Sequence, residues 1–255
     1  MIRRHLTPVL LALLLGSAPL AARADALDAL RWKRYYVRSP ATGKIERFWV
    51  GHRKALDPKG TYPVLYFLPG LLGHESIGRK HFDPHLAKHD LILVSTSVGG
   101  ATWYMNSPRQ PWMKWGDYLR QELRAFVENA YPASRQKGQR GIAGISAGGH
   151  AAFYHAITHP DLYGSVTVLS GAMDLRGYAG AVGLDYWMGP RSPAFFGRYK
   201  DRSCLVLAAE HTGALPFALA LEAGNKDGAL QQMEVFRRVL DGKGLAYHWH
   251  VGAGG

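Results

Sequence analysis

The sequence has a single cysteine, fewer acidic than basic residues, and no long apolar run outside its first 24 residues. A lone Cys204 cannot form a disulfide within the chain, nor can it supply a metal site built from several thiolates. The 255 residues include 31 Lys plus Arg against 19 Asp plus Glu, but the basic residues are scattered along the chain. Nucleic-acid binding is therefore not expected, and an anionic cell-envelope surface is the candidate macromolecular partner. We expect no metal and no other cofactor.

The first 24 residues have the pattern of a secretory signal peptide. Arg3-Arg4 precedes an apolar run from Leu6 to Leu15, and Ala22-Arg23-Ala24 fits an A-x-A cleavage site. The alternative is an N-terminal membrane anchor, but the run is shorter than the ~20 residues that a spanning helix needs. We therefore expect cleavage before Asp25 and a secreted or periplasmic protein in which residues 25–255 form one domain.

Alternating apolar patterns predict an α/β fold. Two segments rich in aromatic and β-branched residues, Trp32–Ser39 and Ile45–His52, flank Pro40-Ala41-Thr42-Gly43 and predict an antiparallel hairpin. Beyond it, short apolar runs alternate with helical stripes, which predicts a mostly parallel central sheet with helices on both faces. The expected strands are Val64–Leu68, Leu91–Thr96, Gly141–Ile145, Gly164–Ser170, Phe217–Glu222 and Leu245–Val251. The expected helices are Asp117–Ala130, Ala147–Thr158, Gln231–Leu240 and one that starts at Asp83-Pro84 with an N-cap aspartate and an N1 proline.

Residues 171–203 interrupt this alternation with a segment rich in glycine and aromatic residues. Long segments of this kind inside a domain are more often functional, so we expect a pocket wall or lid; the alternative is a surface excursion around its own small core. Four other aromatic residues either line an acyl pocket or belong to the core. They are Trp103, Tyr104, Trp112 and Trp115.

A G-x-S-x-G motif at residues 144–148 points to a catalytic serine. A predicted strand precedes it and a predicted helix follows it, so Ser146 would occupy a strained turn that exposes its hydroxyl. The helix N-terminus would then face the negative charge that develops on an attacked carbonyl. The second donor in such a site comes from the loop after an earlier strand, and the glycine-flanked Leu71 follows Val64–Leu68. We therefore expect the backbone N–H groups of Leu71 and Ala147 to bind the oxyanion.

Several motifs together resemble one family. They are Leu68-Pro69-Gly70-Leu71-Leu72-Gly73, Ser97-Val98-Gly99-Gly100 with Trp103-Tyr104, Tyr118–Leu123, Gly144–Gly149, His159–Gly164 and Leu169-Ser170-Gly171. Over nearly all of residues 31–255 the chain is similar to the putative-esterase branch of the α/β-hydrolases. That branch includes S-formylglutathione hydrolases, feruloyl and enterobactin esterases and mycobacterial mycolyltransferases. The resemblance implies an α/β-hydrolase fold and a serine that cleaves esters, without identifying a member.

The resemblance also implies an acid and then a histidine after the nucleophile in chain order. The segment Glu222–Gly228 closes an apolar strand and resembles the acid turn of the family, which makes Asp227 the carboxylate that orients the histidine. Asp174, Asp185 and Glu210 are weaker candidates because none of them follows a core strand.

The family's histidine comes directly after a Gly-Gly pair behind the last strand. Gly254-Gly255 closes this sequence, so the alignment puts the histidine one residue after Gly255. Within the chain the options are His250, which is preferred, and His248, although both fall on the expected last strand. The remaining histidines weighed as metal ligands are instead expected on solvated helix faces. They are His81, His85 and His89, of which the last two would share a helix, together with His155 and His159.

These residues favour an exported serine carboxylic-ester hydrolase that acts on a small-molecule ester through an acyl-enzyme on Ser146. One alternative is an acyltransferase of the mycolyltransferase type, which forms the same acyl-enzyme. A second is a catalytically silent binding protein of the cell envelope on the same fold. The intact serine turn argues against a binding protein, which has no need of a strained turn.

N-terminal sequencing of the exported protein tests the signal-peptide prediction. The mature chain should begin at or within a few residues of Asp25, because the small residues Ala22 and Ala24 form the expected cleavage site. A soluble exported protein that still begins with Met1 would contradict the prediction.

Overall fold

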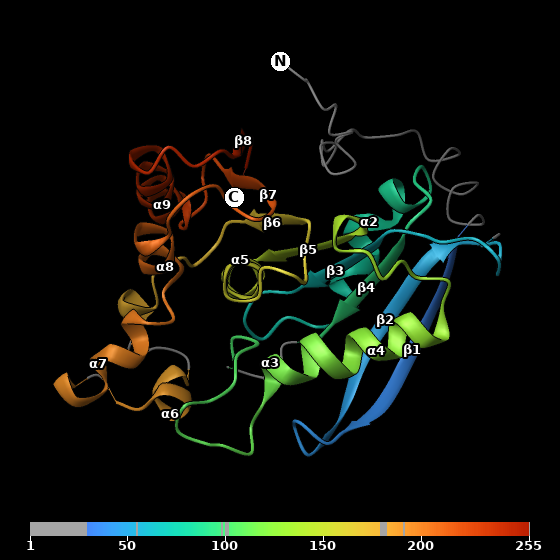
Figure 1. Ribbon diagram of the computed structural model, residues 1–255, viewed down its shortest axis with the longest axis horizontal. Helices are drawn as coiled ribbons and strands as arrows, with labels where there is room; N and C mark the ends of the chain where they lie inside the picture. The colour runs from blue at the N-terminus through green and yellow to red at the C-terminus, as the bar shows by residue number, and fades with distance from the viewer. Residues whose placement is uncertain are drawn as a thin grey trace.

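A computed structural model describes residues 30–54, 56–97, 99, 102–178, 183–190 and 192–254. The predicted signal peptide lies outside these residues. The described strands form one sheet in the order β1-β2-β4-β3-β5-β6-β7-β8 (Figure 1). Their bounds are β1 Leu30–Ser39, β2 Lys44–Arg53, β3 Val64–Leu68, β4 Ile92–Thr96, β5 Arg140–Ile145, β6 Ser165–Leu169, β7 Ala218–Gly224 and β8 His248–Gly252.

The sheet is parallel except at its N-terminal hairpin, as predicted. β1 pairs antiparallel with β2, and β2 pairs antiparallel with β4, whereas all neighbours from β4 to β8 run parallel. β1 and β8 are therefore the two edges of the sheet. Every residue of β3 and β4 is buried, as expected for strands that are covered on both faces.

Alternate residues of the strands face two hydrophobic clusters on opposite faces of the sheet. The even-numbered residues of β3 belong to one cluster with α5 (Ala147–Thr158) and α9 (Leu230–Gly242). The odd-numbered Leu65 and Phe67 belong to the other, with Phe82 and Leu86 of α2. Helices therefore cover both faces, and Figure 1 shows α5 end-on against the sheet and α4 across the hairpin. The predicted α/β fold is confirmed.

The prediction that a helix starts at Asp83-Pro84 is wrong. Helix α2 spans Ile77–Leu86 and contains Pro84. Asp83 does not cap a helix, because its Oδ1 accepts a hydrogen bond from Trp32 Nε1 at 2.7 Å. Phe82 packs against Phe67 with ring centroids 4.8 Å apart. Contacts with β1 and β3 thus set the position of α2 and override the local N-cap signal.

The other predicted strands and helices match the structure to within three residues at each end. One of them is more complex than expected. Residues 115–130 form a continuous helical stretch of α3 (Trp115–Asp117), a π-helical turn (Tyr118–Leu123) and α4 (Arg124–Ala130). Helix α8 (Cys204–Glu210) follows the 171–203 segment and was not predicted.

The segment 171–203 is not a loop around its own small core. It contains a 3₁₀ turn (Leu175–Tyr178), α6 (Leu184–Met188) and α7 (Pro193–Lys200). Its buried residues, among them Leu175, Trp187 and Tyr199, belong to the same cluster as α5 and α9. The segment is therefore an integral part of the main core, and its role as a pocket wall stays a prediction.

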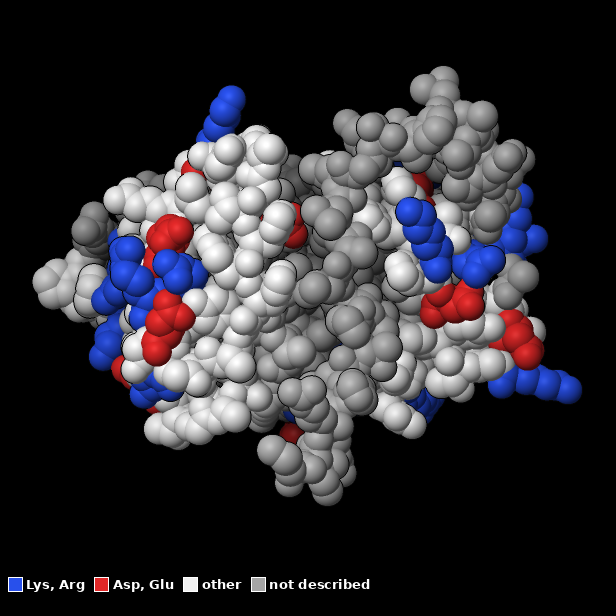
Figure 2. Space-filling model, turned by 90° about the horizontal axis from the view of Figure 1, so that it is seen from above, with Lys and Arg blue, Asp and Glu red and all other residues white. Residues whose placement is uncertain are grey.

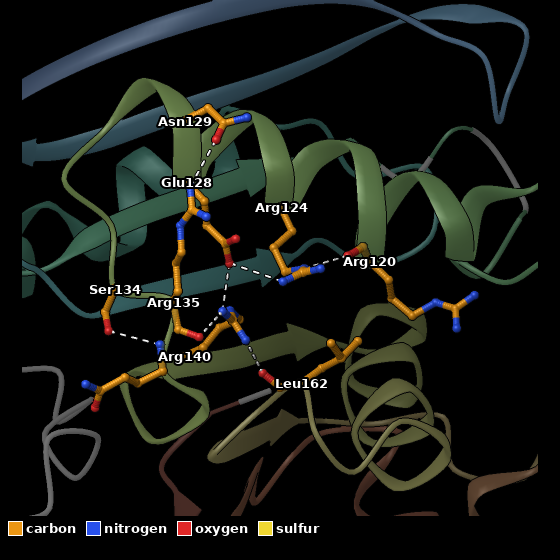
Figure 3. Close-up of polar contacts among 9 residues, drawn as sticks. Arg120, Arg124, Glu128, Asn129, Ser134, Arg135, Arg140 and Leu162 are labelled. Atoms are coloured by element: carbon orange, nitrogen blue, oxygen red, sulfur yellow. Dashed lines mark hydrogen bonds and ion pairs between the residues drawn. The ribbon is translucent and has the colours of Figure 1, made fainter.

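A buried ion pair joins α4 to the amino end of β5 (Figure 3). Arg140, 3% exposed, donates from Nη2 to Glu128 Oε1 at 2.7 Å and to the carbonyl oxygen of Arg135 at 2.9 Å. Its Nη1 donates to the carbonyl oxygen of Leu162 at 2.7 Å. Removing one partner of such a pair leaves an uncompensated buried charge, which costs about 3–5 kcal/mol. This pair therefore fixes α4 and the start of β5 to each other.

Charged side chains on the face seen in Figure 2 gather toward both ends of the molecule, where basic and acidic residues are mixed. Two of the pairs on the surface are Arg53 with Asp90 and Arg237 with Asp241. None of the helices in the described part of the chain combines the length and the apolarity that crossing a bilayer requires.

Candidate active site

Ser146 lies between β5 and α5 in a conformation that is rare for a residue with a side chain. Its φ is +56° and its ψ is −117°. The turn requires glycine at both flanking positions of the motif, because a Cβ at either position would overlap neighbouring backbone atoms. A Cβ on Gly148 would lie 1.9 Å from the carbonyl oxygen of Leu68, and one on Gly144 would lie 2.2 Å from the carbonyl oxygen of Gly148. The predicted strand-to-helix turn at Ser146 is therefore present.

The segment that follows β3 passes directly beside Ser146. A Cβ built on Gly70 would be 3.3 Å from the Cβ of Ser146. Gly73 N donates to the carbonyl oxygen of Gly70 at 2.8 Å, which closes a tight turn with Leu71 and Leu72 at its centre. We call Gly70–Gly73 the oxyanion turn. Ala147 is the first residue of α5, so both predicted oxyanion donors lie next to Ser146, and their role stays a prediction.

Backbone strain is concentrated at the carboxyl ends of four neighbouring strands. The described chain has five non-glycine residues with positive φ, and all lie in the segments that follow β3, β4, β5 and β6. Each such residue costs on the order of 1–3 kcal/mol, and residues of this kind cluster at active sites. They are Leu72, Trp103, Tyr104, Ser146 and Ser170. The carboxyl edge of the sheet is thus the candidate active site.

Asp227 lies in the turn that follows β7, as predicted. Its backbone N–H donates to the carbonyl oxygen of Gly224 at 3.1 Å, and its Oδ1 accepts a hydrogen bond from Ala229 N at 2.8 Å. Tyr178 lies close enough for the Asp227 charge to add to the effect of burial, which raises the pKa of the tyrosine. Asp227 is half-buried, and its Oδ2 makes no hydrogen bond to the described residues.

The three weaker acid candidates are engaged elsewhere. Asp174 accepts hydrogen bonds from Arg176 Nε and Nη2, both at 2.8 Å. Burial raises the pKa of Asp174, but these bonds outweigh burial and leave that pKa below its usual value. Asp185 accepts from the Tyr199 hydroxyl at 2.7 Å, and the exposed Glu210 pairs with Lys200 at 3.7 Å. Asp227 is therefore the carboxylate best suited to orient a histidine.

The histidines of β8 lie beside Glu222 of β7. His250 is paired with Glu222, and His248 is paired with Ala220 two residues away. Burial raises the pKa of Glu222, and the two histidines partly offset that rise. Among the described residues no histidine side chain is hydrogen-bonded to the side chain of Ser146 or Asp227; His150 meets Ser146 only through the backbone, where its N–H donates to the Ser146 carbonyl oxygen at 3.0 Å. The predicted strand location of His248 and His250 is confirmed.

The chain that follows β8 runs along the acid turn. Asn225 N donates to the carbonyl oxygen of Gly252 at 2.9 Å, and Lys226 N donates to that of Gly254 at 2.7 Å. In return, Gly254 N donates to Asn225 Oδ1 at 3.0 Å. These three bonds place residues 252–254 next to Asp227.

Two histidines of α5 are buried and neutral near pH 7. Burial lowers the pKa of His150 to about 4 and that of His155 to about 3. Their Nε2 atoms pair with the carbonyl oxygens of Arg202 at 2.8 Å and Tyr104 at 2.7 Å. The expectation that His155 lies on a solvated face is wrong, because α5 is packed against both the sheet and the loop after β4.

The histidines of α2 also differ from the prediction. His81 and His85 lie within the helix, but His89 follows its end at Leu86, so His85 and His89 do not share a helix. No group of three His, Cys, Asp or Glu side chains in the described ranges is arranged to hold a metal ion.

The aromatic residues weighed as a pocket are mostly core. Trp103, Tyr104 and Trp115 are buried, whereas Trp112 is 68% exposed. Tyr104 nevertheless serves the site, because its hydroxyl donates to the carbonyl oxygen of Pro69 at 3.0 Å, just before the oxyanion turn. Sequence reasoning missed this contact, since nothing in the local pattern links residues 35 positions apart.

Comparison with known proteins agrees with this geometry. A family model described as "Putative esterase" matches residues 51–245. Three solved structures are similar in fold. A ferulic acid esterase is 19% identical with a TM-score of 0.76, covering 89% of this chain and 91% of that one. An S-formylglutathione hydrolase from Agrobacterium tumefaciens is 17% identical with a TM-score of 0.73, covering 88% and 87%. MPT51 from Mycobacterium tuberculosis is 18% identical with a TM-score of 0.68, covering 88% and 91%.

At these identities the three structures show the fold alone. The family model matches most of the chain, and the matched residues 51–245 include the oxyanion turn, the serine turn and the acid turn. The expected resemblance is confirmed: this chain belongs to the "Putative esterase" family of α/β hydrolases.

Proposed function

We propose that the protein is an exported serine carboxylic-ester hydrolase with Ser146 as its nucleophile. The observation that carries the proposal is the left-handed Ser146 with the oxyanion turn packed against it. The family match and the fold likeness to a ferulic acid esterase support cleavage of an ester. Export follows from the signal-peptide pattern alone.

In the proposed reaction Ser146 Oγ attacks the carbonyl carbon of a small-molecule ester. Its proton passes to a histidine that Asp227 orients, and the N–H groups of Leu71 and Ala147 bind the developing oxyanion. The intermediate collapses, the C–O bond to the alcohol breaks, and the alcohol leaves with the histidine's proton. Water then gives a proton to the histidine and attacks the acyl-enzyme, the bond from the acyl carbon to Ser146 Oγ breaks, and the histidine returns its proton to Oγ as the acid leaves.

The base of this reaction is best placed on the chain that follows β8. Residues 252–254 are hydrogen-bonded to the acid turn, so a histidine directly after Gly255 would lie close to Asp227. His250 lies on β8 beside Glu222 and is the weaker candidate.

Transfer of the acyl group to an alcohol in place of water is the second candidate activity. It shares every step up to the acyl-enzyme, and product analysis with and without a sugar acceptor separates the two. A silent binding protein is disfavoured by the strain at Ser146, since binding alone offers no reason to keep a costly backbone conformation.

Labelling with a fluorophosphonate probe tests the nucleophile. The protein that carries a histidine directly after Gly255 should be labelled at Ser146, and Ser146→Ala should abolish labelling because Ser146 is the serine of the G-x-S-x-G turn beside the oxyanion turn. Ser170 is the matched control, since it is a second serine with positive φ at the same edge. Ser170→Ala should still be labelled, and labelling that survives in Ser146→Ala would place the nucleophile elsewhere.

Neutralising the acid tests the role of Asp227. In the protein that carries a histidine directly after Gly255, Asp227→Asn should lower kcat on a short-chain aryl ester by orders of magnitude, on the scale of the ~10⁴ lost when a triad carboxylate becomes an amide. Asp174→Asn is the control, because Asp174 is ion-paired with Arg176 and should lose less than about tenfold. The reverse order of these two losses would assign the acid to Asp174.

The position of the base is tested at the end of β8. A protein extended by a histidine directly after Gly255 should hydrolyse aryl esters at least a hundredfold faster than the 255-residue chain. Its rate should rise with pH through about 6.5 as the histidine loses its proton. If the 255-residue chain is already as fast, and His250→Ala loses that rate while His248→Ala keeps it, then His250 is the base.

A further inference from the structure

A fully buried carboxylate follows the oxyanion turn. The side chain of Glu75 is 0% exposed, and its Oε1 accepts hydrogen bonds from Arg34 Nε at 3.0 Å and from Arg34 Nη2. His74 Nε2 lies 3.3 Å from Oε2. The carbonyl oxygen of Glu75 accepts a hydrogen bond from Ser95 Oγ at 2.7 Å. Glu75 therefore ties the end of this segment to β1 through Arg34 and to β4 through Ser95.

Arg34 is itself held in place. Its guanidinium lies over the rings of Tyr36, with 5.1 Å to the centroid, and Trp49, with 5.9 Å. Stacking on aromatic rings restricts a guanidinium to one plane, so the contact with Glu75 keeps a defined direction. The hairpin thus provides both the cationic partner of the Glu75 carboxylate and the aromatic rings beside that partner.

The oxyanion turn needs support at both ends. Leu72 has a φ of +60° and is 76% exposed, so its own side chain has little packing that could hold this strained conformation. A strained residue persists only where its surroundings determine its conformation. On one side of the turn the Tyr104 hydroxyl holds the carbonyl oxygen of Pro69. On the other side, two residues after Gly73, Glu75 is bound by Arg34 and Ser95.

We propose that Glu75 is a positioning residue whose buried carboxylate, neutralised by Arg34, keeps the oxyanion turn aimed so that Leu71 N–H meets the oxyanion. The inference rests on the proposed esterase function. It assigns Glu75 no contact with the substrate. It assigns the Arg34–Glu75 pair an effect on the transition state, where the oxyanion forms, and little effect on binding of the ground-state ester.

The ion pair of Arg140 with Glu128 makes a matched control. Arg140 and Glu128 form the same kind of bond at the amino end of β5, the opposite edge of the sheet from Ser146 (Figure 3). Glu75→Gln removes the counter-charge of the partly exposed Arg34, and Glu128→Gln removes that of the buried Arg140, so both should lower the melting temperature by several degrees. The two variants therefore separate loss of stability from loss of positioning.

The test compares kcat and KM on a short-chain aryl ester for the unsubstituted sequence, Glu75→Gln and Glu128→Gln, each carrying a histidine directly after Gly255. Loss of one oxyanion donor lowers kcat by about 10²–10³, which bounds the effect of a displaced turn. We expect Glu75→Gln to lower kcat about ten- to a hundredfold with KM changed less than about twofold. Glu128→Gln should keep kcat within about twofold of wild type. Equal kcat values for the two variants would overturn the proposal.

Arg34→Lys keeps the test decisive if Glu75→Gln does not fold. Lysine retains the charge beside Glu75 but loses the planar guanidinium, so the protein should fold while the turn loosens. We expect kcat to fall and the rate at which a fluorophosphonate labels Ser146 to fall by the same factor, because phosphonylation also places an oxygen in the oxyanion site. Unchanged rates of both in folded Arg34→Lys would refute the positioning role.

The outcomes also separate this inference from the proposed function. A protein that carries a histidine directly after Gly255, and that is neither labelled at Ser146 nor active on esters, overturns both. A wild-type protein that is labelled, together with a folded Glu75→Gln variant that is labelled equally fast, overturns the positioning role alone.

Discussion

The close approach of two backbone segments at Gly148 is the constraint on which the site depends. The first turn of α5 lies so near the end of β3 that a single methyl group at this position would overlap the carbonyl oxygen of Leu68. Because α5 cannot move away without losing its packing on the sheet, Ser146 is forced into its left-handed turn. The same contact brings the segment after β3 beside the serine. Nucleophile and oxyanion turn are therefore positioned by one packing contact between glycine and backbone.

The support of the site extends outward from this contact in two directions. Tyr104, from the loop after β4, holds the segment before the oxyanion turn, and Glu75 holds the segment after it through Arg34 of the hairpin. The antiparallel hairpin thus extends the sheet and also supplies, from β1, the Arg34 charge that pairs with Glu75 after the oxyanion turn. Residues 252–254 have a corresponding relation to the acid turn at the other side of the sheet.

Sequence patterns predicted the elements that depend on local chemistry. β3 and α5 have the predicted bounds, since a short apolar run and a G-x-S-x-G motif each define their own ends. Sequence patterns failed where contacts between residues far apart in the chain determine the local structure. Asp83 has the sequence pattern of an N-cap, but its side chain instead accepts a hydrogen bond from Trp32, 51 residues away. The pairing of Glu75 with Arg34 joins residues 41 positions apart, and neither residue type is unusual in its own segment. The acid turn was found only through family resemblance, because an aspartate in a turn is ordinary on its own.

The basic residues on edge strand β1 affect how two copies of the protein interact. It is ten residues long and, among the described strands, pairs only with β2, so its outer side offers backbone groups for pairing with a second molecule. Long edges of this kind promote aggregation unless charged residues interrupt them. Arg31, Lys33 and Arg38 are exposed along β1. When two copies approach edge to edge these like charges repel, so the arginines and lysine that line the strand favour colloidal solubility over intermolecular sheet growth.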